Sequence, residues 1–183
     1  MVFTYTLAAM VGLFTAAAAA TDIRSQKIPN LLTVPAAILG LVFHVIHGFL
    51  VPEAYGFGGG IGFALAGFAV GFVLLLIPAL LGGGGMGDIK LLAALGAWLG
   101  PMYILFAFGA SAVFASMMAI SVLIWSALNR GVTTTKETYL IRGNTDLEEG
   151  DAPRPRSRVL PYAVPVALGT WLVLSWLLLR GHL

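Results

Sequence analysis

Cysteine is absent from this chain of 183 residues, and charged residues are scarce. The absence of cysteine excludes disulfides, thiolate metal sites and thiol nucleophiles, so any catalysis must use oxygen or nitrogen groups. Charged residues make up 10% of the chain, against about 25% in soluble domains. Hydrophobic residues make up 59%, which indicates an all-α, polytopic integral membrane protein.

Apolar segments alternate with polar or glycine-rich breaks along the whole sequence. A helix needs about 20 apolar residues to cross a hydrocarbon core of about 30 Å. We therefore predict a single membrane domain, residues 1–183, that is a bundle of about six transmembrane helices. The spans are expected at about 2–20, 31–51, 57–81, 88–100, 102–128 and 159–179. The fourth is short, and one broken helix over 88–128 is the alternative.

The first apolar segment ends in small residues and resembles a cleavable signal peptide. It lacks the positively charged start of such peptides, so we expect a retained first span.

Basic residues cluster in the breaks at 22–30, 82–90 and 129–158, which hold nine of the ten Lys and Arg residues. Six spans would place these breaks on one face, and the positive-inside rule makes that face cytoplasmic, with both termini outside. We expect these basic residues to lie beside the lipid bilayer, and we do not expect them to bind nucleic acid. The mixed-charge stretch 129–158 is predicted to be a mobile cytoplasmic loop, with a substrate or anionic-lipid contact as the alternative.

Two acidic residues are placed differently from the rest. Five of the eight acids lie in the 129–158 stretch, and Glu53 lies in a turn on the opposite face. Asp22 and Asp88 are left at the cytoplasmic ends of spans, where ionisable groups are costly and are candidates for function. Paired carboxylates hydrolyse peptides when one activates water and the other, protonated, hydrogen-bonds the scissile carbonyl. The alternative for each alone is a helix cap or an interfacial charge.

Three segments carry a resemblance to a known family. Residues 85–92 read Gly-Met-Gly-Asp-Ile-Lys-Leu-Leu and contain Gly-x-Gly-Asp followed by x-Lys. Residues 22–30 begin with an aspartate, continue with basic residues and end in Ile-Pro-Asn, and residues 158–165 read Arg-Val-Leu-Pro-Tyr-Ala-Val-Pro. In this order they resemble the type IV prepilin peptidases, which are Gly-x-Gly-Asp membrane aspartyl proteases.

The resemblance implies cleavage of the leader of prepilins or pseudopilins at the cytoplasmic membrane, after a glycine. It implies Asp22 and Asp88 as catalytic residues and no metal, nucleotide or organic cofactor. Similar longer enzymes carry a domain with paired Cys-x-x-Cys motifs and methylate the new amino terminus. This sequence lacks both that domain and cysteine, so it resembles the short Tad/Flp pilus branch, and methylation is not expected.

Other residues of these segments are expected to support the site, while no substrate-binding residue is assigned. Gly85 and Gly87 are predicted to adopt positive φ beside a substrate strand, the alternative being a flexible loop. Lys90 is two positions past Asp88, so it faces away, and we expect it to reach the headgroups. Asn30 or Thr33 is predicted to cap the second span.

Helix direction suggests which aspartate is the base. Asp88 starts a helix, where its anion is favoured, whereas Asp22 follows a helix end, where it is not. Asp88 would then be the resting base. His44 and His47 are not expected to bind metal, because they lie far along the chain from both aspartates.

Two other classes of function fit the composition. A small transporter would use the aspartates for cations or protons, although transporters place such charges near the midplane. A noncatalytic assembly protein leaves the paired motifs unexplained.

Overall fold

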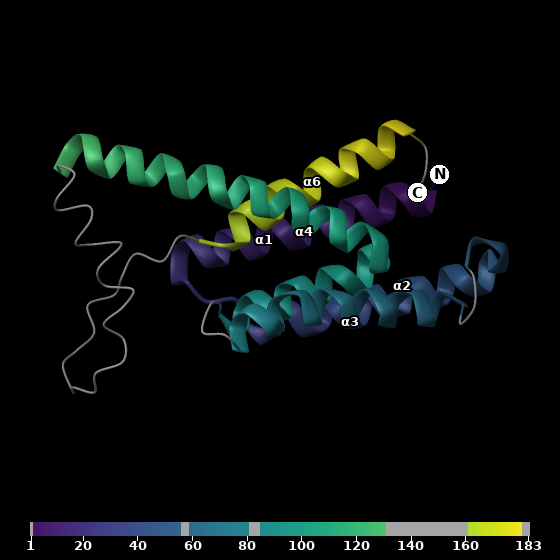
Figure 1. The fold of residues 1–183 in the computed structure, drawn as a ribbon. Helices are drawn as coiled ribbons and strands as arrows, with labels where there is room; N and C mark the ends of the chain where they lie inside the picture. The colour runs from purple at the N-terminus through teal and green to yellow at the C-terminus, as the bar shows by residue number, and fades with distance from the viewer. Residues whose placement is uncertain (1, 56–58, 81–84, 131–160, 181–183) are drawn as a thin grey trace. The chain divides into compact units, whose positions relative to one another are not determined.

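The computed structural model describes residues 2–55, 59–80, 85–130 and 161–180. All elements in these ranges are helices, which confirms the all-α prediction. They are α1 (Val2–Ser25), α2 (Asn30–Leu50), the short 3-10 helix η1 (Pro52–Ala54), α3 (Gly59–Leu80), α4 (Met86–Arg130) and α6 (Ala163–Arg180), as Figure 1 shows. Most of the predicted loop at 129–158 lies outside the described residues.

The chain divides into two compact units. One comprises Met1–Phe114 and Pro161–Leu183, and the other comprises Ala115–Leu160. Both aspartates belong to the first unit, which the following paragraphs describe.

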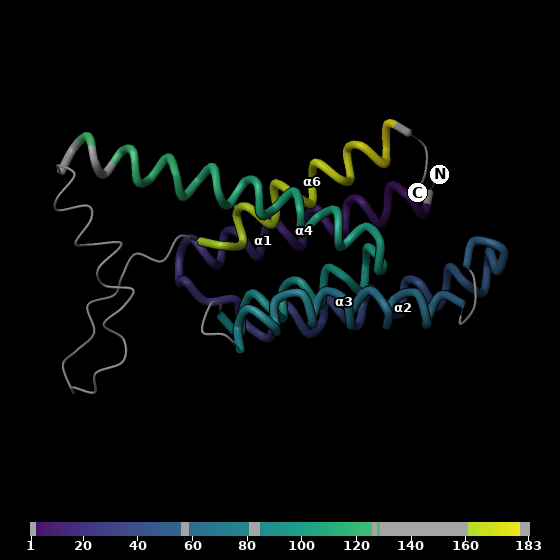
Figure 2. Tube along the Cα trace, viewed as in Figure 1, coloured from purple at the N-terminus to yellow at the C-terminus, as the bar shows by residue number. Residues whose placement is uncertain are grey.

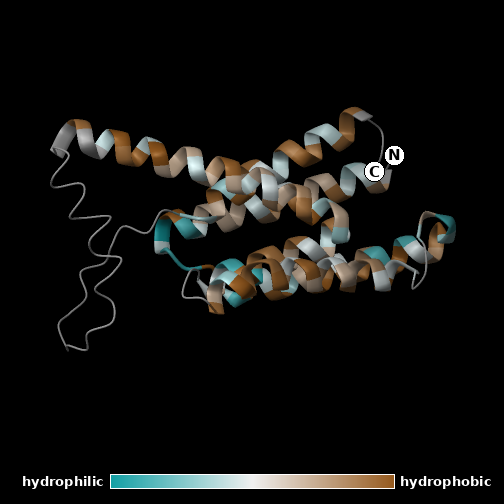
Figure 3. Cartoon of the chain, viewed as in Figure 1, coloured by the Kyte–Doolittle hydropathy of each residue, from teal (hydrophilic) through white to brown (hydrophobic). Residues whose placement is uncertain are grey.

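The outer faces of the helices are apolar. In the part of the chain that the structure describes, four stretches are long and apolar enough to cross a membrane: Phe3–Ser25, Asn30–Leu50, Pro52–Leu80 and Met86–Trp125. Large side chains on their outer faces are exposed, for example Leu31 at 87% and Phe49 at 82%, and Figure 3 shows apolar residues along the helices. Such surfaces are stable only against lipid, so the chain is a multi-pass membrane protein.

A break divides α4 at Gly100. This residue has φ 76° and ψ 175°, which lies outside the helical region and in the part of backbone space that glycine enters easily. Pro101 follows and has no N–H to continue the hydrogen-bond ladder. The trace reverses direction here in Figure 2, so residues 86–99 form a short helical segment of their own. The six-span arrangement counts the segments on the two sides of this break as separate membrane spans, and it stays a prediction.

The segment before the break is the core of the first unit. Residues 91–100 are all buried, and they include Leu91, Leu95 and Trp98 with at most 4% of their surface exposed. A helix that is apolar on every side needs neighbours on every side. The other helices therefore pack around this segment, which begins next to Asp88.

Glycines allow α3 to pack directly on this core segment. A methyl group added at Gly67 would overlap the carbonyl oxygen of Gly96, and one added at Gly71 would overlap that of Leu92. Likewise, Gly60 lies against the carbonyl of His44 in α2. Small residues at these positions thus let the backbones of neighbouring helices approach closely.

The first span is an integral part of the fold. Val11 and Ala18 of α1 are completely buried, and the indole N–H of Trp171 in α6 donates to the hydroxyl of Thr15 in α1 at 2.8 Å. The packing of α1 against α6 brings the end of α1 to the start of α6.

Replacing Gly67 by alanine is expected to destabilise the protein, because the new methyl group meets the Gly96 backbone, which cannot rotate away. We expect a loss of about 1–3 kcal/mol, as for overpacked cores. Thermal unfolding in one detergent measures it. Gly12→Ala is the matched control, because nothing lies within 4 Å of a methyl group there. Equal unfolding temperatures for the two variants would contradict the packing described.

Candidate active site

Asp22 lies in the last turn of α1 and is buried, with 7% of its surface exposed. Its Oδ2 atom accepts a hydrogen bond from the backbone N–H of Ala163 at 2.9 Å. Ala163 is the first residue of α6, and the first N–H groups of a helix have no partner within the helix. Asp22 therefore does for α6 what an N-cap side chain does, across 141 positions of sequence.

Asp88 is the third residue of α4 and is half-buried. Its backbone N–H donates to the carbonyl of Gly85 at 3.1 Å, and its carboxylate interacts with the Gly85 backbone. An acidic side chain in the first turn of a helix is stabilised by the unpaired N–H groups there. The start of α4 thus orients this carboxylate.

The two carboxylates meet in one place. The charge of Asp22 acts on Asp88, and the charge of Asp88 acts on the phenol of Tyr162, the residue just before α6. Three segments far apart in the sequence therefore converge: the end of α1, the start of α4 and the start of α6. Tyr162 was not predicted as a site residue, although it lies within the third segment of the family resemblance.

The glycines of the Gly-x-Gly-Asp motif serve a different purpose from the one predicted. Neither Gly85 nor Gly87 has positive φ, so that prediction is wrong, and Gly87 is part of α4. A methyl group at Gly85 would come within 3.2 Å of the Asp88 carboxylate. One at Gly87 would lie 3.5 Å from Ile28. Gly85 thus leaves room for the carboxylate, whereas a methyl group at Gly87 would make only an ordinary van der Waals contact. Positions 82–84 lie outside the described residues.

Lys90 joins two of the motifs. Its ammonium group donates to the Oδ1 atom of Asn30 at 2.9 Å, and Lys90 is exposed. That this side chain reaches the headgroups stays a prediction. Asn30 does not cap α2, since the N-cap position is Pro29 and has no side-chain hydrogen bond. The buried hydroxyl of Thr33 has no hydrogen-bond partner among the described residues. Lys90 and Asn30 instead link the start of α4 to the start of α2.

Helix direction does not assign the proton between the aspartates. The sequence argument placed Asp22 at the end of α1 alone, but the folded chain also places its carboxylate at the start of α6. Each carboxylate therefore lies at a helix N-terminus, and the reason for choosing Asp88 as the resting base is lost.

The geometry defines a class of protein: a multi-pass membrane protein in which two carboxylates meet at the end of a buried helix. The chain belongs to the type IV leader peptidase family, whose model matches residues 9–120, more than half of the chain. The matched region contains both Asp22 and Asp88.

Curated relatives agree with this membership. The chain is 39% identical over 82 residues to a protein of Neisseria gonorrhoeae, a match that covers 43% of this chain and 27% of the relative. It is 30% identical over 176 residues to one of Xanthomonas campestris pv. campestris, covering 92% and 49%. Both are named "Prepilin leader peptidase/N-methyltransferase". The chain spans about half the length of these relatives or less, and no solved structure matches it significantly.

The hydrogen bond from Ala163 predicts that Asp22 contributes to stability. Asp22→Ala removes the acceptor at the start of α6 and is expected to lower the free energy of unfolding by about 1 kcal/mol, as the loss of a cap does. Asp22→Asn keeps an oxygen acceptor and should stay close to the parent protein. Thermal unfolding of both variants in the same detergent measures the difference. If Ala and Asn unfold at the same temperature, the hydrogen bond has no stabilising role.

Proposed function

We propose that the chain is a membrane aspartyl endopeptidase that removes the leader peptide of type IV prepilins or pseudopilins by cleavage after a glycine. One observation carries the proposal: Asp22 and Asp88, brought together from α1 and α4, lie close enough for their charges to interact.

Two such carboxylates divide the work of hydrolysis. The ionised one takes a proton from water as the water oxygen attacks the carbonyl carbon of the scissile peptide, and the protonated one donates to the carbonyl oxygen. Close carboxylates share one proton because two neighbouring negative charges repel each other. The Ala163 N–H holds Oδ2 of Asp22, which leaves its other oxygen available to water or to Asp88.

The substrate class follows from the relatives. Their printed names combine a prepilin leader peptidase with an N-methyltransferase, and we carry over only the peptidase. Paired carboxylates support peptide hydrolysis. Assignment to the Tad/Flp branch rests on the sequence resemblance alone.

We further propose one membrane domain with about six spans and an active site that faces the cytoplasm, in the bacterial inner membrane. The exposed basic residues Arg24 and Lys27 follow Asp22, and Lys90 follows Asp88. Basic residues beside the ends of spans favour the cytoplasmic face, so the carboxylates would meet the leader there while the apolar part of the pilin stays in the bilayer.

A transporter is not proposed. Both carboxylates lie in terminal turns of their helices, whereas transporter sites lie near the bilayer midplane between broken helices. Membership of the peptidase family also favours hydrolysis.

Conversion of either aspartate to asparagine is expected to abolish prepilin processing, because each variant keeps the side-chain shape but loses one proton-transfer group. Loss of such a group slows catalysis by roughly 10²–10⁴-fold. Co-expression with a candidate prepilin, followed by gel analysis of the shortened product, measures Asp22→Asn and Asp88→Asn.

Glu53→Gln is the matched control for this experiment. It makes the same chemical change at an exposed carboxylate in η1, outside the site, and should process normally. Full processing by Asp22→Asn or by Asp88→Asn would rule out the proposed mechanism.

A further inference from the structure

A cavity of about 580 Å³ lies at the end of the first unit opposite the aspartates. It is lined by the start of α1, the end of α2 and the region of the Gly100 break, and its walls include the rings of Phe3, Phe43, Phe63 and Trp98. From Phe3 to Asp22, α1 rises by about 28 Å at ~1.5 Å per residue. The volume falls within the range of roughly 300–1,000 Å³ that small-molecule sites occupy.

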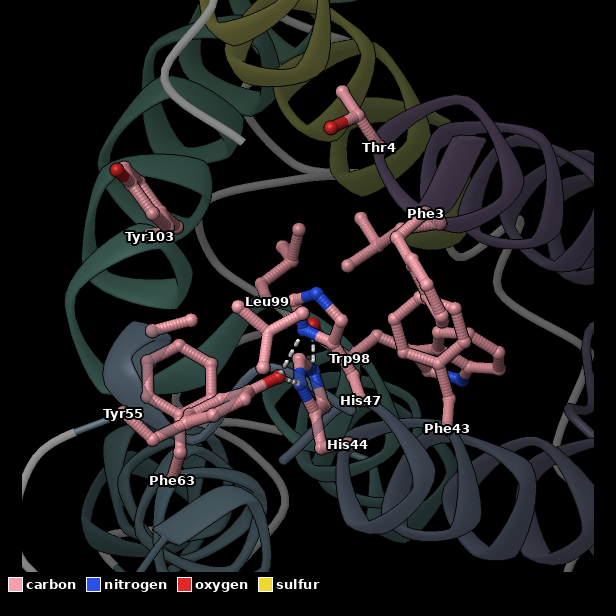
Figure 4. Close-up of a pocket in the computed structure, with 13 residues that line it drawn as sticks. Phe3, Thr4, Phe43, His44, His47, Tyr55, Phe63, Trp98, Leu99 and Tyr103 are labelled. Carbon is pink, nitrogen blue, oxygen red and sulfur yellow. Dashed lines mark hydrogen bonds between the residues drawn. The ribbon is translucent and has the colours of Figure 1, made fainter. Parts of the chain in front are cut away.

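Two histidines and a tyrosine form a chain of hydrogen bonds in the cavity wall. The Tyr55 hydroxyl lies 2.7 Å from Nδ1 of His44 and 2.8 Å from Nδ1 of His47. Nε2 of His44 lies 2.7 Å from the carbonyl oxygen of Trp98. Figure 4 shows the Tyr55 hydroxyl between the two imidazole rings, while the hydroxyl of Tyr103 points away from them.

The Trp98 carbonyl fixes the direction of this chain. A carbonyl only accepts, so Nε2 of His44 carries the proton. Among the described residues, none that lines the cavity carries a carboxylate. With both rings neutral, Nδ1 of His44 then accepts the hydrogen bond from the Tyr55 hydroxyl. The tyrosine oxygen in turn accepts from Nδ1–H of His47. The lone pair of His47 is therefore on Nε2.

The ring that carries this lone pair is held between aromatic neighbours. The centroid of the His47 ring lies 4.4 Å from that of Phe3, and it stacks with Phe43 at 6.2 Å. In the described part of the chain, the His47 ring makes one hydrogen bond, which is the one to the Tyr55 hydroxyl. The cavity thus combines aromatic walls with the acceptor nitrogen of His47.

We propose that this cavity binds a small neutral aromatic molecule that carries one O–H or N–H donor, of the phenol or indole class. The ring packs against the phenylalanine and tryptophan walls in offset or edge-to-face geometry, and the donor binds Nε2 of His47. The same chemistry occurs in soluble phenols and in the headgroup of a membrane hydroquinone.

Binding of phenol and of toluene to the full chain in nanodiscs tests this assignment, because the two probes have nearly the same shape and differ in the donor. With ¹⁵N-labelled histidine, NMR is expected to show His44 protonated at Nε2 and His47 at Nδ1. Phenol should shift the Nε2 resonance of His47 saturably and bind roughly two- to tenfold more tightly than toluene, as one net hydrogen bond allows.

Two variants separate the acceptor from the cavity. His47→Phe removes the acceptor, so phenol and toluene should bind alike, as followed by probe-observed NMR. Ala54→Trp fills the cavity without replacing a polar group and should abolish binding of both probes. The proposal is overturned by an absence of saturable binding, by equal affinity for the two probes in the parent protein, or by a preference for phenol that persists in His47→Phe.

A further pair of probes identifies the source of the ligand. Hydroquinone with a decyl chain should bind more tightly than hydroquinone alone if the natural ligand is a membrane hydroquinone, whereas equal affinity supports a soluble phenol. Failure of both to shift His47 contradicts the proposed class.

Discussion

The burial of residues 91–99, within the helical segment 86–99, is the constraint on which the rest of the structure depends. These residues are apolar on every side of the helix. Their burial therefore stabilises the fold only when other helices cover all faces of the segment. Close approach on one face requires a backbone without side chains, which Gly67 and Gly71 of α3 provide. The segment then carries Asp88 at one end and the Gly100 break at the other.

At the end of the segment that carries Asp88, the carboxylate of Asp22 both stabilises the fold and belongs to the candidate active site. The N–H groups that begin α6 need an acceptor, because an unpaired backbone group is costly where water is excluded. Asp22 supplies that acceptor from α1 and is thereby held near Asp88. The same hydrogen bond that anchors α6 therefore helps to position the carboxylate pair.

The cavity at the other end follows from the break in α4. Trp98 is among the last residues of the buried segment, where carbonyl groups lose their helical partners. His44 donates to this carbonyl and so sets the protons of Tyr55 and His47. A helix end within the bundle has thus determined which nitrogen of His47 is free to accept a hydrogen bond.

The sequence by itself determined the membrane class, the helical fold, the break near Gly100 and the two aspartates, because apolar runs, glycine, proline and isolated acids are local signals. It did not determine which partners those residues meet. The predictions for Gly85, Gly87 and Asn30 were wrong because each was inferred from its own stretch of chain. The hydrogen bond from Lys90 to Asn30 was not foreseen for the same reason. Only the tertiary structure places Asp22 at the start of α6, since a hydrogen bond across 141 positions leaves no periodic or local trace. For the same reason, the place of Tyr162 beside the aspartates and the hydrogen bonds that link His47, Tyr55, His44 and Trp98 could not be predicted from the sequence.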